Sequence, residues 1–447
     1  MVSPKLIFAL SLLALPILAL AAPKKHEEEE DNDNESDEEM SDSNSDSDSS
    51  GKSYGIIMDA GSGGTRAFAY SWSTGSPGKV ETIMDKDKPF SVKLKPGLSS
   101  LSSGEMEKYM GELIDGVSEV IPKSARAQTT VQLMATAGLR LLPGSKADDI
   151  ISTVKSILSS SPFKSSPGTA ATIISGAQEG VYGWMALNTL SGSLGQSSSI
   201  AAIAMGGAST QITFAAPSAV PAAYATTLEL GGSKTSLYTH SYLGYGATEV
   251  RAKYIDTLLG AGGNSSSVRD PCGLEGNSVK GTSSKGNNVT LTGTGNVKEC
   301  MAALRATLDL QGSCAQEPCA VQGAFQPEIP SDMKIQATNN FADLAKAFKC
   351  DSEDSSIQCL LDATAKTCPS MSVDEAKDEW SKDMDDPSLV CFQGMYAAVI
   401  LQDGFHIAPD HPITFSDNAG DVKKMTYTLG AMISSLNPSG VSISASE

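Results

Sequence analysis

Short apolar runs that end in glycine-rich turns are the clearest pattern along this chain. Residues 54–58 form one such run, Asp59-Ala60-Gly61-Ser62-Gly63-Gly64-Thr65-Arg66 follows it, and residues 67–72 then alternate in hydrophobicity. These patterns predict a buried strand, a turn and a second strand. A glycine-rich turn exposes backbone N–H groups, which form a nest for an anion such as phosphate. Taken by itself, this unit could equally be an ordinary hairpin without a bound anion. Asp59 at the end of the first strand is a candidate metal ligand, directly or through water.

The same arrangement recurs about 147 residues later. The run Ile200–Met205 leads into Gly206-Gly207-Ala208-Ser209-Thr210-Gln211, and residues 212–214 begin a further strand. Two units of this kind suggest duplicated lobes that hold one phosphate chain between them. Neither unit matches the Walker A pattern, which requires a Gly-Lys-Ser/Thr ending.

Three further segments complete the predicted α/β pattern. Residues 131–140 predict a strand that runs into a turn, and residues 173–184 predict a strand followed by a helix that starts near Gly176. Glu179 would lie in the first turn of that helix, where the helix dipole by itself favours a carboxylate. The apolar segment 392–400 predicts a helix that belongs to the core.

The N-terminus has the pattern of a secretory signal peptide. Lys5 precedes the apolar run 6–15, Pro16 interrupts it, and small residues end it at Ala22. This order predicts a cleaved signal at 1–22, with a retained signal anchor as the minor alternative. No later run approaches the roughly 18 apolar residues of a membrane span, so we expect none in the mature chain.

Charge is concentrated next to the signal. The 447-residue chain carries a formal net charge of −19, and thirteen Asp or Glu but no Lys or Arg lie between residues 26 and 50. Such a segment buries too little apolar area to fold, so residues 23–53 are predicted to be an acidic disordered spacer. The negative balance argues against nucleic acid as a partner, because phosphate backbones require a positive surface. The sequence leaves the oligomeric state open.

The cysteines agree with export. All eight lie in the C-terminal half, and an even number behind a signal peptide predicts four disulfides, with Cys314–Cys319 as the shortest local pair. Glycosylation sequons stand at Asn34, Asn264 and Asn288, and the last two flank a Ser/Gly/Asn-rich surface excursion at 261–296. We therefore expect a glycoprotein that is secreted or resides in the secretory-pathway lumen.

Four ordered segments resemble the conserved regions of the apyrase, or nucleoside triphosphate diphosphohydrolase, family. They are DAGSGGTR (59–66), ATAGLR (135–140), ISGAQEGVYGWMALNTLSG (174–192) and MGGASTQITF (205–214), and three later blocks at 237–246, 391–398 and 427–432 are also similar. The resemblance covers about residues 54–435. It implies two actin/RNase H-like lobes with the active site in the cleft between them. Lobe I would be 54–174 plus 423–447, and lobe II, with every disulfide, 175–422.

The resemblance also implies an activity and a site. The activity is hydrolysis of terminal phosphates from nucleoside tri- and diphosphates with Ca²⁺ or Mg²⁺. By position, Glu179 matches the base that activates the attacking water, Ser209 and Gln211 match residues that orient that water, and Thr136 matches a hydroxyl near the terminal phosphate. Asp59 matches a carboxylate that holds the water shell of the metal. The two phosphate loops would comprise Ser62, Gly63, Gly64 and Thr65, and Gly206, Gly207, Ala208 and Ser209.

Three positions depart from that family pattern. Ala204 stands where an acidic residue that helps hold metal-bound water is usual, Gly63 replaces a Ser or Thr, and Tyr427 replaces a Trp. Because Ala cannot hydrogen bond such water, cation affinity and turnover are expected to be lower than usual. The alternatives are a catalytically impaired nucleotide-binding protein and an exopolyphosphatase-like hydrolase. The latter would need basic residues along a polyphosphate channel, and its usual cytoplasmic setting disagrees with the signal peptide.

Overall fold

The computed structural model describes residues 51–73, 79–86, 88–216, 220–230, 232–260, 265–310, 316–352, 355–382 and 384–443. The predicted signal peptide and nearly all of the acidic segment lie outside these ranges. So do Asn34, Asn264 and Cys314. Residues 47–447 form one compact unit, and the description below concerns that unit.

The first sheet carries the first glycine-rich turn. Its strand order is β3-β2-β1-β7-β8, with β6 also paired to β2. Strand β1 is antiparallel to β2 and parallel to β7, which is parallel to β8. The strands are β1 (Lys52–Gly61), β2 (Gly64–Ser73), β3 (Glu81–Thr82), β6 (Ser91–Leu94), β7 (Thr130–Ala135) and β8 (Ala171–Ile173), and β4 (Met84–Asp85) pairs separately with β5 (Lys88–Pro89).

The second sheet repeats this order around the second turn. Its order is β17-β16-β9-β10-β12-β11-β18. Strand β9 is antiparallel to β10 and parallel to β16, just as β1 in the first sheet is antiparallel to β2 and parallel to β7. The strands are β9 (Ala201–Met205), β10 (Ser209–Ala215), β11 (Ala225–Leu230), β12 (Ser233–Leu243), β16 (Ile335–Asn339), β17 (Ile413–Phe415) and β18 (Val441–Ile443). The repetition places both turns between the first and second strands of their sheets. The predicted mixed α/β class is therefore confirmed.

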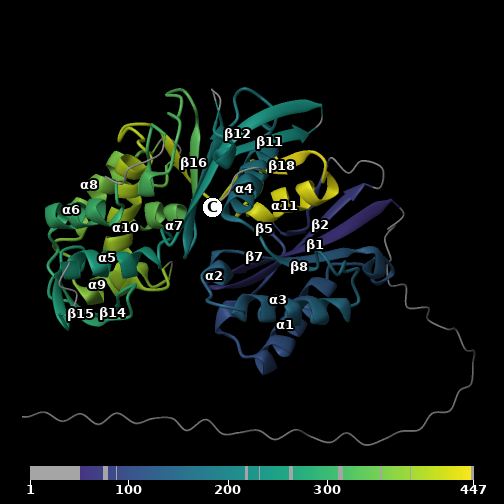
Figure 1. Ribbon diagram of the computed structural model, residues 1–447, viewed down its shortest axis with the longest axis horizontal. Coiled ribbons are helices and arrows are strands. Elements are labelled where there is room, and N and C mark those ends of the chain that lie inside the picture. The colour runs from purple at the N-terminus through teal and green to yellow at the C-terminus, as the bar shows by residue number, and fades with distance from the viewer. Residues whose placement is uncertain are drawn as a thin grey trace, which may run out of the picture. The chain divides into compact units, whose positions relative to one another are not determined.

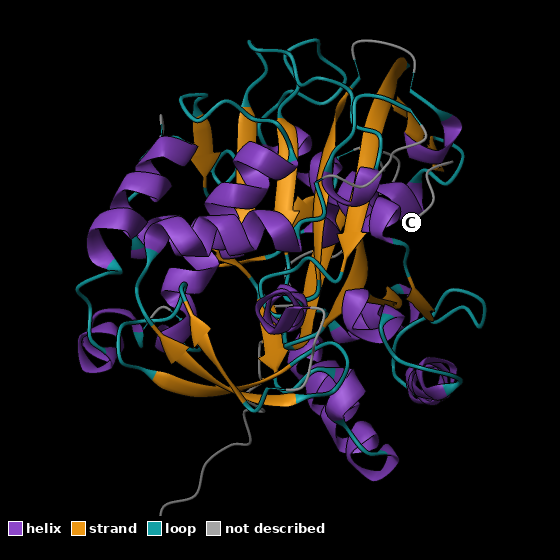
Figure 2. Ribbon diagram, turned by 60° about the vertical axis from the view of Figure 1, so that its left-hand side comes forward, coloured by secondary structure: helices purple, strands orange, loops and turns teal. Residues whose placement is uncertain are grey.

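Two groups of helices cover the first sheet. Figure 1 shows α1 (Ser103–Ser118) and α3 (Lys146–Ser159) together on one side of β1, β7 and β8, with α4 (Gly176–Leu190) and α11 (Tyr427–Leu436) on the other. The buried side chains of α4 and α11 join Ile57 and Phe68 of the first sheet and Leu228 and Leu237 of the second in one apolar cluster. These two helices therefore pack between the sheets, and Figure 2 shows helices on both sides of the strands.

Helix α4 begins where the sequence predicts. Ser175 is its N-cap: the Ser175 side chain accepts a hydrogen bond from the Gln178 N–H, and the Gln178 side chain reaches back to the Ser175 N–H. This reciprocal capping satisfies two N–H groups that the helix itself cannot. The first turn, with Glu179, thereby has a fixed starting direction.

A helical subdomain continues from the second sheet. Its helices are α5 (Val250–Leu259), α6 (Val297–Thr307), α7 (Asn340–Ala347), α8 (Ile357–Thr367), α9 (Val373–Trp380) and α10 (Val390–Val399). Nine of the ten α10 residues are buried, which confirms that segment as core. Within the described ranges, no helix is long and apolar enough to cross a membrane.

The 261–296 stretch contains strands that the sequence analysis did not predict. Strands β13 (Ser267–Asp270), β14 (Ser278–Thr282) and β15 (Asn288–Gly293) form a separate sheet. Val289 and Leu291 pack against Ile255 of α5 beneath it. Because the apolar positions are sparse among Ser, Gly and Asn, their alternation is hard to recognise in the sequence.

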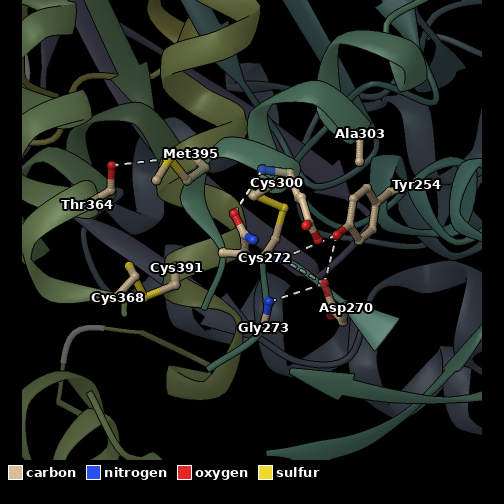
Figure 3. The surroundings of a disulfide bond; sticks show 12 residues. Tyr254, Asp270, Cys272, Gly273, Cys300, Ala303, Thr364, Cys368, Cys391 and Met395 are labelled. Atoms are coloured by element: carbon tan, nitrogen blue, oxygen red, sulfur yellow. Dashed lines mark hydrogen bonds between the residues drawn. A yellow bond between two sulfur atoms is a disulfide. The ribbon is translucent and has the colours of Figure 1, made fainter. Parts of the chain in front are cut away.

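Three disulfides link this subdomain. They are Cys272–Cys300, Cys350–Cys359 and Cys368–Cys391. Cys319 is also disulfide-bonded, but Cys314 is outside the described residues, so the predicted Cys314–Cys319 pair stays a prediction. Figure 3 shows that Asp270 fixes the chain next to the first disulfide, since it accepts hydrogen bonds from Tyr254 and from the Cys272 and Gly273 N–H groups.

The end of the chain is shared between the two sheets. Helix α11 packs on β1 and α4, whereas β18 pairs with β11 of the second sheet. Strand β18 thus extends the second sheet at β11. The return of 423–447 to lobe I and the other lobe boundaries stay predictions.

Candidate active site

The two glycine-rich turns face each other. A Cβ added to Gly207 in the second turn would lie 2.6 Å from the Ser62 Oγ of the first, and one added to Gly138 would lie 2.8 Å from the Ser62 Cα. The absence of side chains at these glycines therefore permits the close approach. Ser62 and Gly63 are exposed, so the first turn is accessible to a ligand.

The second turn is held by its carbonyl groups. The Gly206 oxygen accepts from the Ala247 N–H, the Gly207 oxygen from the Thr248 and Glu249 N–H groups, and the Ala208 oxygen from the Gly244 N–H. The N–H and C=O of one trans peptide point in opposite directions. The N–H groups of Gly207 and Ala208 consequently point away from segment 244–249, as an anion-binding nest requires.

Thr65 occupies a different environment from the other predicted loop residues. Its side chain is fully buried, and its N–H donates to the Tyr109 hydroxyl at 3.1 Å. That hydroxyl in turn donates to the Leu94 or Pro96 carbonyl. Thr65 thus anchors the start of β2 against α1, and its role toward a ligand stays a prediction.

Glu179 belongs to a hydrogen-bonded cluster. Its Oε2 lies 3.1 Å from Arg140 Nη2 and 3.5 Å from Gln211 Nε2. Gln211 also donates to the Ser209 hydroxyl at 2.6 Å and to the Ser241 hydroxyl at 3.1 Å. Ser209 and Gln211 lie two positions apart on β10 and therefore share one face of the sheet. The fold thus brings together the three residues that the sequence associates with water activation.

Arg140 was not predicted as a site residue. It ends the short helix α2 (Ala137–Arg140) after β7, and its guanidinium also donates to the Ile174 carbonyl at 2.8 Å and to the Ser209 hydroxyl at 3.4 Å. Its side chain is only 6% exposed and that of Glu179 17%. The one signal in the sequence was that Arg140 ends the ATAGLR segment, but its hydrogen-bond partners are 34 to 69 residues away in sequence.

Thr136 is the N-cap of α2, the short helix that Arg140 ends. It is buried, and both its N–H and its hydroxyl lie within hydrogen-bond distance of the Ala60 carbonyl, at 3.1 and 3.4 Å. Ala60 directly follows Asp59 on β1. The structure therefore places Thr136 beside the first turn.

Asp59 lies at the C-terminal end of β1, opposite Arg66 in the β1–β2 register. Burial raises the pKa of Asp59, whereas the charge of Arg66 and a hydrogen bond from Tyr427 act in the opposite direction. The Tyr427 hydroxyl is 3.0 Å from Asp59 Oδ1 and 3.2 Å from the Met134 carbonyl oxygen. Sequence reasoning noted Tyr427 as a replacement but missed this contact.

Ala204 lies on the face of the second sheet that carries Gln211. In the strand registers it is opposite Gln211 on one side and Thr338 on the other, and directly opposite residues project to the same face of a sheet. An acidic side chain at this position would therefore extend toward the Gln211 cluster. The alanine present provides no such oxygen.

A divalent cation at this site would have few ligands from the protein itself. No group of three or more His, Cys, Asp or Glu residues that could hold a metal occurs in the described part of the chain. Mg²⁺ commonly uses one or two carboxylates and completes its shell with waters and substrate phosphates. A single carboxylate, Asp59, next to two phosphate-type turns fits that mode of binding through water.

The repeated sheets and their facing turns define a two-lobed, actin-like α/β protein. A solved structure described as nucleoside triphosphate hydrolases from Neospora caninum has this fold, with a TM-score of 0.62 at 14% identity over 87% of this chain and 93% of that one.

Residues 45–445 match the GDA1/CD39 (nucleoside phosphatase) family, and the chain belongs to this family. It is 30% identical over 408 residues to probable apyrase 4 of Arabidopsis thaliana, covering 85% of this chain and 78% of the relative. It is 38% identical over 230 residues to the human nucleoside diphosphate phosphatase ENTPD5, covering 49% of this chain and 52% of that protein. The family resemblance inferred from the motifs is confirmed.

Proposed function

We propose that this protein hydrolyses the terminal phosphate of nucleoside tri- and diphosphates in a reaction that depends on Ca²⁺ or Mg²⁺. The observation that carries the proposal is the Glu179–Ser209–Gln211 cluster beside two facing glycine turns. Membership of a nucleoside phosphatase family supports the same reaction class.

Each residue of the site has a chemical task in this proposal. Glu179 accepts a proton from the attacking water, and the Ser209 hydroxyl and Gln211 amide orient that water. The N–H groups of the two turns stabilise the charge on the phosphate oxygens, which is the main requirement of phosphoryl transfer. Thr136 contacts the terminal phosphate. When bound, the divalent ion would neutralise phosphate charge, and Asp59 would hold its water shell.

The direct experiment is phosphate release by the purified mature chain. ATP, ADP, GDP, UDP and inorganic polyphosphate would each be tested with Ca²⁺, Mg²⁺ or EDTA. We expect metal-dependent release from the nucleotides, loss of release in Glu179→Ala, and full activity in Glu107→Ala, because Glu107 is an exposed glutamate on α1. Full release by Glu179→Ala would rule out its role as base. Release from polyphosphate alone would favour the exopolyphosphatase alternative.

A second candidate function rests on Ala204. The missing carboxylate opposite Gln211 favours a protein that binds nucleotide but turns it over slowly or not at all. Nucleotide binding without phosphate release from any substrate would support this alternative.

We also propose that the chain enters the secretory pathway. The signal pattern, the disulfides and the Golgi apyrase of Schizosaccharomyces pombe among its relatives support this location. The sequon at Asn288 is exposed at the start of β15 and is accessible to glycosylation. Peptide mass spectrometry of the exported protein, with and without glycosidase, would test both the cleavage near Ala22 and the glycan at Asn288.

A further inference from the structure

The contact between Tyr427 and Asp59 links the last helix of the fold to the proposed metal side of the site. Within the described part of the chain, the Tyr427 hydroxyl is the only hydrogen-bond donor to Asp59, and it approaches Oδ1 at 3.0 Å. A phenol has one proton to donate. The charged carboxylate is a stronger acceptor than the Met134 carbonyl at 3.2 Å, so we assign the hydrogen bond of the phenol to Asp59.

The position of Tyr427 is fixed by the packing of α11. The Thr428 hydroxyl, one residue on, lies 2.6 Å from the Tyr70 hydroxyl of β2. A Cβ on Gly430 would lie 2.0 Å from the Tyr182 carbonyl oxygen of α4, so the two helices are in backbone contact there. With α11 held against β2 and α4, the phenol has little freedom to leave Asp59.

The second carboxylate oxygen of Asp59, Oδ2, differs from Oδ1 in its hydrogen bonding. Oδ2 accepts no hydrogen bond from the described residues, while Oδ1 is occupied by Tyr427. A carboxylate held at one oxygen keeps its plane fixed and presents the second oxygen to a ligand. In metal sites, such supporting hydrogen bonds orient the ligand, and their loss typically lowers metal affinity or activity about 10- to 100-fold.

We infer that Tyr427 is a positioning residue that orients Asp59 toward the water shell of the bound divalent cation. This inference rests on the proposed function and adds a determinant of cation affinity that lies on the C-terminal helix. It also explains why the tyrosine at this position matters: with Ala204 in the chain, Asp59 is the one carboxylate proposed for the metal side of the site.

The test compares Tyr427→Phe with Tyr70→Phe. Both variants lose one hydroxyl that hydrogen bonds between α11 and the first sheet, but only the Tyr427 hydroxyl contacts Asp59. The first readout is the Kd of Mg²⁺, by calorimetry on protein saturated with a non-hydrolysable ATP analogue. The second is the Mg²⁺ concentration at half-maximal phosphate release, measured apart from kcat at saturating Mg²⁺.

We expect Tyr427→Phe to raise the Mg²⁺ Kd about 10- to 100-fold and to recover most of its kcat at high Mg²⁺, while Tyr70→Phe keeps the wild-type Kd. Asp59→Asn serves as the reference for complete loss of the carboxylate. A raised Mg²⁺ Kd in Asp59→Asn together with an unchanged Mg²⁺ Kd in Tyr427→Phe would overturn the inference and leave the proposed function intact. An Mg²⁺ Kd unchanged even in Asp59→Asn would remove Asp59 from the metal site and the inference with it, while the Glu179→Ala assay would still decide the hydrolytic function.

Discussion

The Arg140–Glu179 ion pair gives the most direct quantitative prediction. Arg140→Leu removes a guanidinium that lies 3.1 Å from the Glu179 carboxylate and 2.8 Å from the Ile174 carbonyl oxygen. The two charged side chains are only 6% and 17% exposed, so water can replace the lost contact only in part. The Glu179 carboxylate then remains in a poorly solvated place without this cation.

The expected cost follows from those distances. At an effective dielectric constant of about 20, two unit charges at this separation attract each other by about 5 kcal/mol. Desolvation offsets part of that gain, and removal of one partner from a buried pair usually costs about 3–5 kcal/mol. Because Glu179 retains some exposure, we expect a loss of about 3 kcal/mol in the free energy of unfolding. Misplacement of the base should also lower kcat about 100-fold.

Urea unfolding at pH 7 and steady-state phosphate release would measure these two effects. The double variant Arg140→Leu/Glu179→Gln should regain more than half of the lost stability, since it no longer contains the Glu179 charge that the Arg140 guanidinium faces in the wild type. Lys108→Leu is the control, because its ion pair with Glu112 is 83% and 51% exposed and should be worth under about 1 kcal/mol. A loss below 1 kcal/mol in Arg140→Leu, with no recovery in the double variant, would refute the reasoning.

Three further predictions follow from single positions. Ala204→Asp should lower the Mg²⁺ concentration for half-maximal phosphate release about tenfold or more, whereas Ala204→Asn should change it much less. Equal Mg²⁺ titration curves for the wild type and both variants would mean that another group already holds the metal-bound water. Gly138→Ala should reduce kcat/KM strongly because its Cβ would lie 2.8 Å from the backbone Cα of Ser62. Gly63→Ala should be tolerated because no atom lies within 4 Å of the added Cβ, and equal activities of the two variants would contradict the close backbone packing at the first turn. Burial lowers the pKa of His240 from 6.5 to about 4, so between pH 6.5 and pH 4 the unfolded chain binds more protons than the folded one. The free energy of unfolding should therefore fall by up to about 3 kcal/mol as the pH drops through this range, and urea unfolding at pH 7 and 4.5 should show a smaller loss for His240→Phe than for the wild type.

The parts of the fold that the sequence predicts are those in which local pattern and tertiary structure agree. The run 54–58 lies within β1, the turn at Ser62 and Gly63 joins it to β2, and the helix expected near Gly176 begins there. In each case the signal is local, as an apolar run, a glycine pair or a capping serine. Strands β13–β15 were missed because their few apolar residues gain their burial from α5, which is a tertiary effect.

The candidate site was predictable as a set of residues but not as a set of contacts. Glu179, Ser209 and Gln211 stand in recognisable segments. Arg140 also joins Glu179 to Ser209, yet it is 39 positions from the first and 69 from the second. Tyr427 is 368 positions from Asp59. No periodicity encodes such pairs, because each depends on how the two sheets and helices α4 and α11 pack together. A replacement that looks mild in the sequence, tyrosine for tryptophan, therefore acquires its meaning only from the carboxylate that its hydroxyl contacts, Asp59 Oδ1 at 3.0 Å.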